Sequence, residues 1–240
     1  MSIVFGDCRE VLKTLPRARL ILTDPPYNIG FSGYGCHDDN MEPSEYIAMI
    51  ATLKQYADIV AVIQYPEETM RFVVPALGVP DEVLAWCYNS NISRQFRLVS
   101  IYGGLPDRSR VLQPYKNPND KRVKKLIDSG SRGTPIYDWF SDIQLVKNVS
   151  IEKSCHPCPI PERLAERMIS MLTTEGDIVL DPFAGGGTVP CVAQRMGRIG
   201  VGIEKDPIYF QSAVERFASK EDWEIWDAES RADAEREGPP

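Results

Sequence analysis

The sequence predicts an α/β fold with a doubly wound, mostly parallel sheet, and three observations lead to this prediction. Short apolar runs alternate with longer amphipathic stretches along most of the 240 residues, as in strands joined by crossover helices. Prolines stand near the first turns of four of these stretches, where a missing N–H is harmless: Pro43, Pro66, Pro161 and Pro207. Hydrophobic residues make up 43% of the chain, enough for one sizeable core.

The elements follow from these patterns in order along the chain. Buried strands are expected at Ile3–Phe5, Leu20–Leu22, Ile59–Ile63, Val83–Tyr88, Leu98–Tyr102, Ile178–Leu180 and Ile199–Ile203. Helices are expected at Arg9–Thr14, Pro43–Ala57, Pro66–Val74, Pro161–Leu172, Thr188–Met196 and Pro207–Phe217.

Three regions depart from this alternation. Residues 28–42 are rich in glycine and asparagine and predict a loop directly after Tyr27. Residues 105–134 are rich in proline, glycine and charge and predict a small inserted lobe. Residues 219–240 are acidic and polar, so we expect a main domain over residues 1–218 and a separate acidic tail.

The charge distribution is uneven. A net charge of −7 is the wrong sign for general attraction to phosphates. The middle of the chain is nevertheless basic, and its candidate DNA-binding residues are Arg108, Arg110, Lys116, Lys121, Arg122, Lys124, Lys125 and Arg132. Lys121–Lys125 could equally form a solvated helix face. Arg94, Arg97, Tyr115 and Tyr137 are candidates for base contacts or stacking, with packing as the alternative.

Metal binding and membrane insertion are not expected. Cys155 and Cys158 have the spacing of half a zinc site, but Cys36 and His37 form a poor second half of a four-ligand set. We therefore predict no metal. The sequence has neither the basic-then-apolar plan of a signal peptide nor an apolar run of about 18 residues, so a cytoplasmic protein is expected.

The strongest chemical signal is Asp24-Pro25-Pro26-Tyr27, directly after the apolar run Leu20–Leu22. Ligands bind at the carboxyl ends of strands in open α/β sheets. An aromatic exocyclic amine is a weak nucleophile because its lone pair is delocalised into the ring. Hydrogen bonds from that amine to Asp24 and to a carbonyl of Pro25 or Pro26 would favour a pyramidal nitrogen. Tyr27 could stack on a base flipped out of its duplex.

A second signal is the glycine-rich turn Asp181-Pro182-Phe183-Ala184-Gly185-Gly186-Gly187-Thr188, between a predicted strand and a predicted helix. Such a turn allows close approach of a cofactor to the backbone. Glu204 ends the next predicted strand, where an acid commonly binds ribose hydroxyls. The turn lacks the spaced glycines of a dinucleotide site and the Gly-Lys-Ser/Thr of a P-loop.

Together, these motifs resemble the β group of DNA amino-methyltransferases, which make N6-methyladenine or N4-methylcytosine. In that family a DPPY motif comes first, a target-recognition region next, and a cofactor motif of the FxGxG type last. Here the matching segments are Asp24–Tyr27, residues 105–149 and Phe183–Gly187. The resemblance implies the fold of S-adenosylmethionine-dependent methyltransferases, with that compound as cofactor.

The resemblance also implies which residues form the site. Cofactor contacts would come from Asp7, Cys8, Asp24, His156, Asp181, Pro182, Phe183, Ala184, Gly185, Gly187, Thr188, Glu204 and Lys205. The family's Lys-Pro after His-Pro is replaced here by Cys158-Pro159, which leaves Ser154 as a substitute donor.

The expected activity is methyl transfer to adenine N6 in duplex DNA by base flipping and direct displacement. Cytosine N4, an RNA adenine, and an inactive nucleic-acid-binding protein of the same fold remain alternatives. The resemblance also allows a homodimer and a paired restriction endonuclease.

Overall fold

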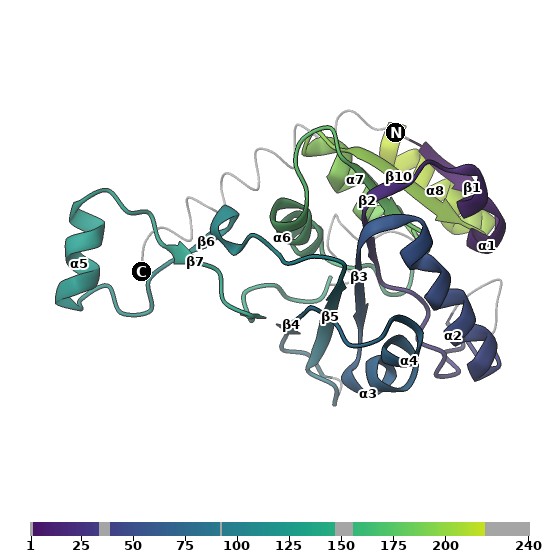
Figure 1. The fold of residues 1–240 in the computed structure, drawn as a ribbon, viewed down its shortest axis with the longest axis horizontal. Coiled ribbons are helices and arrows are strands. Elements are labelled where there is room, and N and C mark those ends of the chain that lie inside the picture. The colour runs from purple at the N-terminus through teal and green to yellow at the C-terminus, as the bar shows by residue number, and fades with distance from the viewer. Residues whose placement is uncertain (1, 34–38, 92, 147–155, 219–240) are drawn as a thin grey trace.

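An eight-stranded sheet dominates the computed structural model, which describes residues 2–33, 39–91, 93–146 and 156–218 (Figure 1). The order of strands across the sheet is β1 (Ser2–Phe5), β10 (Ile199–Glu204), β9 (Ile178–Asp181), β2 (Ala18–Thr23), β3 (Ala57–Gln64), β5 (Phe96–Tyr102), β4 (Glu82–Cys87) and β8 (Trp139–Phe140). The strands from β1 to β3 are parallel, and β5 is antiparallel to both of its neighbours. The predicted α/β architecture with a mostly parallel sheet is confirmed.

Helices cover both faces of the sheet because the central strands are apolar on both sides. Leu20 and Leu22 of β2 pack with α6 (Glu162–Leu172) and α7 (Thr188–Arg195). Ile21 faces the opposite way and packs with residues of α1 (Cys8–Val11), α2 (Pro43–Thr52) and α4 (Val74–Leu77). The last helix, α8 (Pro207–Ala218), packs on β1 and β10. Because both faces are covered, a ligand can reach the sheet only at the ends of its strands.

The strand order brings together segments that are distant in sequence, at the C-terminal ends of the parallel strands. β2 lies beside β9 with Ile21 opposite Leu180, so the segments after these two strands are neighbours. β1 lies beside β10 with Phe5 opposite Glu204. Because all four strands are parallel, the turns that begin at Gly6, Asp24 and Pro182 meet at the same edge as Glu204.

All seven predicted strands form, but some helix boundaries differ. The helix predicted at Pro43–Ala57 is wrong at its end, since it tightens into a 3₁₀ turn (Leu53–Gln55) and Ala57 already belongs to β3. The helix predicted at Pro66–Val74 runs on to Leu77 as α3 (Pro66–Glu68), a π-helical turn η3 (Thr69–Val73) and α4. Pro75 has no N–H to donate within this helix, and the wide turn lies directly before it.

Residues 105–134 leave the main body, as the inserted-lobe prediction expects (Figure 1, teal). This lobe contains a 3₁₀ turn (Arg108–Arg110), α5 (Lys121–Asp128) and the antiparallel pair β6 (Leu112–Gln113) and β7 (Thr134–Pro135). Asp120 caps α5 by accepting hydrogen bonds from the N–H groups of Arg122 and Val123. No helix in the described ranges has the length and apolar character needed to cross a membrane. The acidic tail, Cys36, His37, Ser154 and Cys155 lie outside the described residues.

Candidate active site

A cavity of about 440 Å³ opens at the carboxyl edge of the sheet, a size typical of sites for small ligands. Eleven predicted site residues line it: Asp7, Cys8, Asp24, Pro25, Pro26, Tyr27, His156, Pro182, Phe183, Glu204 and Lys205. They come from the ends of β1, β2, β9 and β10 and from the segment before α6. The fold therefore brings the two motifs, which are more than 150 positions apart, into one cavity.

Asp24 is the first residue of the Asp24–Tyr27 turn, and both of its carboxylate oxygens have partners. The Tyr27 hydroxyl donates to Oδ1 at 2.5 Å, and Nη1 of Arg97 lies 3.3 Å from Oδ2. Burial raises the pKa of Asp24, while the charge of Arg97 and the Tyr27 hydrogen bond lower it. Arg97, a candidate for base contacts, is buried against Asp24 and lines the same cavity.

The prolines hold the backbone of the turn in a fixed shape. The Pro26 carbonyl accepts a hydrogen bond from the Tyr46 hydroxyl at 2.6 Å, and Gln64 donates to that hydroxyl at 2.7 Å. In the described part of the chain, no hydrogen bond reaches the Pro25 carbonyl. Pro25 is therefore the better placed of the two prolines to accept a hydrogen bond from a substrate amine.

The loop after Tyr27 is ordered where the structure describes it. Asp39 accepts hydrogen bonds from the N–H groups of Asn28, Ile29 and Phe31, at 2.7, 3.1 and 3.3 Å. The Asn28 side chain pairs with the backbone of Met41 in both directions. These contacts place Phe31 and Met41 on the cavity wall.

The other half of the cavity centres on Glu204. Its carboxylate accepts hydrogen bonds from the N–H groups of Gly185 and Asp206, both at 2.7 Å. Burial raises the pKa of Glu204, and these backbone donors oppose that shift. An anchored acid beside Phe183 suits a ligand that offers hydroxyl groups and a flat ring, which is what the nucleoside part of S-adenosylmethionine offers.

The glycine turn itself is covered by other segments. Gly185 has a φ of +51°, and a Cβ there would lie 3.0 Å from the His156 ring. His156 also packs edge-on against Tyr209 at 4.8 Å between ring centroids. Five residues predicted to contact the cofactor do not line the cavity: Asp181, Ala184, Gly185, Gly187 and Thr188. They form the support behind it, and Thr188 accepts a hydrogen bond from Arg216 of α8.

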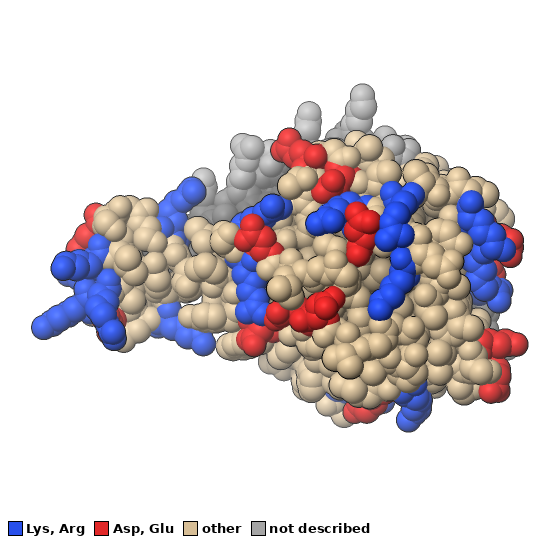
Figure 2. All heavy atoms as spheres, viewed as in Figure 1, with Lys and Arg blue, Asp and Glu red and all other residues tan. Residues whose placement is uncertain are grey.

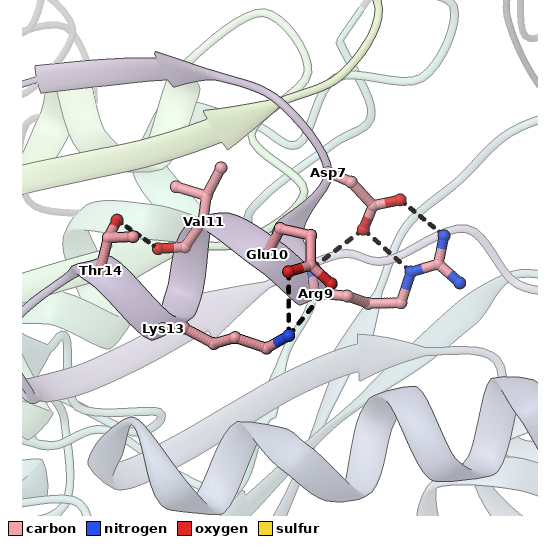
Figure 3. A network of polar contacts seen from close by, with 6 residues as sticks. All are labelled: Asp7, Arg9, Glu10, Val11, Lys13 and Thr14. Carbon is pink, nitrogen blue, oxygen red and sulfur yellow. Dashed lines mark hydrogen bonds and ion pairs between the residues drawn. The ribbon is translucent and has the colours of Figure 1, made fainter.

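Asp7 caps the N-terminus of α1 and lines the same half of the cavity. Its carboxylate accepts hydrogen bonds from the backbone N–H and the guanidinium of Arg9 (Figure 3). The side-chain hydrogen bond from Arg9 lowers the pKa of Asp7. Its charge is thus largely satisfied within the protein.

Asp181 is the buried link between the two motifs. It is 4% exposed and accepts hydrogen bonds from the Thr23 hydroxyl at 2.7 Å and from the Phe183 N–H at 3.1 Å. Since Thr23 precedes Asp24, this contact ties the end of β2 to the end of β9. Burial raises the pKa of Asp181 to about 7.

This shift predicts a pH dependence of stability. A carboxyl group whose pKa is raised by folding favours the folded state at low pH and loses that contribution as pH rises from about 4 to about 7. Asp181→Asn removes the titration but keeps an acceptor for Thr23 and Phe183. We expect the variant to gain stability relative to wild type between pH 5 and pH 7, at up to roughly 1 kcal/mol per pH unit, and the gain to level off at higher pH. Thermal melts across this range check it, and parallel curves for the two proteins would refute it.

The basic candidates divide into three groups. Arg108 pairs with Glu82, and Arg110 pairs with Asp107 and donates to the Thr173 carbonyl, so both fasten the lobe to the main body. The Lys116 ammonium lies 4.5 Å from the centroid of the Tyr137 ring. The remaining basic residues are exposed on or after α5, and Figure 2 shows basic side chains gathered at this tip of the lobe. They are Lys121, Arg122, Lys124, Lys125 and Arg132.

No group of three or more metal-ligating side chains occurs among the residues that the structure describes. Nδ1 of His156 accepts a hydrogen bond from the Cys158 N–H at 3.3 Å. The absence of a metal site stays a prediction, and Cys155 lies outside the described residues.

The fold and cavity define an S-adenosylmethionine-dependent methyltransferase. Residues 80–215, more than half of the chain, match the family model N6_N4_Mtase, described as DNA methylase, and the chain belongs to this DNA methyltransferase family. The match covers the glycine turn and Glu204 but not the Asp24 turn. Membership confirms the family predicted from the motifs, without deciding between adenine N6 and cytosine N4.

The chain is also similar to individual DNA methyltransferases in sequence or in fold. The chain is 29% identical to the type II methyltransferase M.HpaI of Haemophilus parainfluenzae over 89% of its own length and 74% of that relative. It shares its fold with the PvuII cytosine-N4-specific DNA methyltransferase (TM-score 0.65, 18% identity, 91% and 86% of the two chains). It also matches the M1.HpyAVI complex with S-adenosylmethionine (TM-score 0.61, 20% identity, 90% and 98%).

Proposed function

We propose that this DNA methyltransferase transfers a methyl group to N6 of adenine in duplex DNA, with Asp24-Pro25-Pro26-Tyr27 as the catalytic turn. The observation that carries the proposal is the position of the Asp24 carboxylate in the same cavity as Glu204 and Phe183. An acceptor for the amine and a site for the methyl donor are therefore adjacent. The Asp-Pro-Pro-Tyr form of the turn resembles adenine-N6 enzymes more than cytosine-N4 enzymes, and this resemblance favours adenine.

The residues of the turn act on the amine. When bound, S-adenosylmethionine supplies an electrophilic methyl group on its sulfonium. Asp24 and the Pro25 carbonyl accept the two amine hydrogens, which holds the nitrogen pyramidal with its lone pair directed at that methyl group. Asp24 is also the nearest acceptor for the proton that the nitrogen loses after it is methylated. The nitrogen attacks directly, without a covalent enzyme intermediate.

The aromatic side chains receive the flipped base. Tyr27 and Tyr65 pack edge-on with 5.2 Å between ring centroids, and both line the cavity with Phe31. In the structure the Tyr27 hydroxyl occupies one Asp24 oxygen. The incoming amine must share or replace that contact, so entry of the base reorganises the turn.

Cytosine N4 is the competing substrate, because PvuII methyltransferase, named for that specificity, has the same fold. Transfer assays with duplex DNA and RNA of mixed sequence, followed by nucleoside analysis of the products, decide between them. We expect N6-methyldeoxyadenosine. A result in which N4-methyldeoxycytidine is the sole product, or in which only the RNA is methylated, would contradict the proposal. Failure to bind S-adenosylhomocysteine would instead identify an inactive protein of this fold.

We further propose that the exposed basic residues of the lobe contact DNA phosphates. The triple variant Lys121→Ala/Lys124→Ala/Lys125→Ala should weaken DNA binding and lower the slope of log affinity against log salt by about 0.9 for each phosphate that the variant no longer neutralises. Its affinity for S-adenosylhomocysteine should not change. Titration of labelled duplex at several salt concentrations measures the slope, with Lys13→Ala, an exposed lysine outside the lobe, as control. A slope equal to that of wild type would remove α5 from the DNA interface.

A further inference from the structure

Arg97 has an unusual position for a charged side chain. It lies on β5, is 7% exposed, and is surrounded by the rings of Tyr27, Tyr65, Trp86 and Tyr88 at 5.3 to 5.9 Å from its guanidinium carbon. Its ion pair among the described residues is with Asp24, at 3.3 Å. Its Nε is buried and makes no hydrogen bond to a described residue.

Packing alone does not explain a guanidinium here. Removing a charge from water is costly unless a partner of opposite charge compensates it, and an apolar side chain would fill this aromatic pocket at lower cost. Arg94 offers a comparison within the same segment. It also lies over Tyr65, at 4.5 Å, but it pairs with Glu68 and its side chain is 40% exposed. Of the two arginines, only Arg97 pairs with Asp24.

We infer that Arg97 is a positioning residue for methyl transfer, which holds the Asp24 carboxylate ionised and oriented toward the substrate amine. This inference rests on the catalytic role proposed for Asp24. Arg97 lies on the cavity wall beside the turn and pairs with Oδ2, so Oδ1 is the oxygen left to exchange its Tyr27 contact for the amine.

The groups around Asp24 determine its charge. Burial raises the pKa of Asp24, and Arg97 from β5 is the strongest opposing influence, followed by the Tyr27 hydroxyl from the same turn. Asp181, at the end of β9, is an acid close enough to interact with Asp24. Tyr65 and Tyr88 interact with Arg97 from the segments after β3 and β4. Arg97 is the cation among these groups, so its removal should raise the pKa of Asp24 further.

The test measures kcat from pH 5.5 to 9.5 at saturating DNA and cofactor. Arg97→Met should lower kcat by about 100-fold at pH 6.5 and by less than about 10-fold at pH 9.5, because the acid limb of the profile moves to higher pH as the pKa of Asp24 rises. Arg97→Lys retains the charge and should keep the wild-type shape of the profile. Arg71→Met is the control, because Arg71 is an exposed arginine over the Phe72 ring that does not line the cavity, and it should change neither kcat nor the profile.

Three results would overturn the inference. They are an Arg97→Met variant with wild-type kcat, a loss of kcat that is the same at every pH, and an equal effect of Arg71→Met. If Asp24→Ala is inactive while Arg97→Met is unchanged, only this inference fails. If Asp24→Ala remains active, the proposed function fails with it.

If Arg97→Met does not fold well enough to bind S-adenosylhomocysteine, melting temperatures replace the kinetic test. Asp24→Asn combined with Arg97→Met removes both members of the pair and leaves no buried unpaired charge. We expect this double variant to melt at a higher temperature than Arg97→Met alone. A double variant that melts at the same temperature or lower would show that Arg97 only fills space, and would contradict the inference.

Discussion

Replacing Asp24 with alanine should lower kcat by about 10³-fold or more, because the variant loses the acceptor that orients the amine in the transition state. Binding of S-adenosylhomocysteine should stay within a few-fold of wild type, since the cofactor half of the cavity is built on β9 and β10 rather than on this turn. Single-turnover methyl transfer and a cofactor titration measure the two quantities separately.

The alanine variant also leaves Arg97 buried without its carboxylate, so some loss of thermal stability is expected. Rates should therefore be compared well below the melting temperature. Asp24→Asn is the informative companion, because an asparagine oxygen can still accept a hydrogen bond and should retain more activity than alanine. A rate near that of wild type for Asp24→Ala would exclude the turn as the catalytic site.

Replacing Glu204 with alanine should weaken binding of S-adenosylhomocysteine by roughly 10- to 100-fold, the loss expected for hydrogen bonds to a charged group. Two effects contribute. The variant lacks the proposed acceptor for ribose hydroxyls, and the N–H groups of Gly185 and Asp206 lose the carboxylate that holds them. Calorimetric titration measures the affinity directly.

Glu204→Gln is the control for this prediction. Its amide oxygen can keep one of the two backbone hydrogen bonds, so the glycine turn should be less disturbed and the loss of affinity smaller. An affinity equal to wild type in Glu204→Ala would remove Glu204 from the cofactor site. A drop in kcat at saturating cofactor, with no change in affinity, would place Glu204 in the chemistry instead.

The parts of the site that are local in sequence could be predicted. Asp24 and Glu204 each follow an apolar strand directly, and the carboxyl ends of parallel strands share one edge. Asp7, which lines the cavity, was indicated only by the resemblance to the family. The resemblance also indicated Asp181 and Thr188, which do not line the cavity, because residues that support a cavity from behind look the same in sequence as those that line it.

Contacts between distant strands could not be predicted. Arg97 reaches Asp24 only because β5 runs antiparallel next to β3, an order that no local pattern reveals. Tyr46 reaches the Pro26 carbonyl from α2, and this contact between a helix and a distant turn has no local signal in the sequence either. The lobe could be located by its composition, but the helices predicted from the sequence do not include α5.

A crystal structure with S-adenosylhomocysteine and a duplex substrate tests the central claim most directly. We expect an adenine outside the duplex, its N6 about 3 Å from an Asp24 oxygen and from the Pro25 carbonyl, with the cofactor ribose at Glu204. Arg97 should still contact the other Asp24 oxygen. An extrahelical base held elsewhere, or a cofactor bound away from Glu204 and Phe183, would contradict this account of the site.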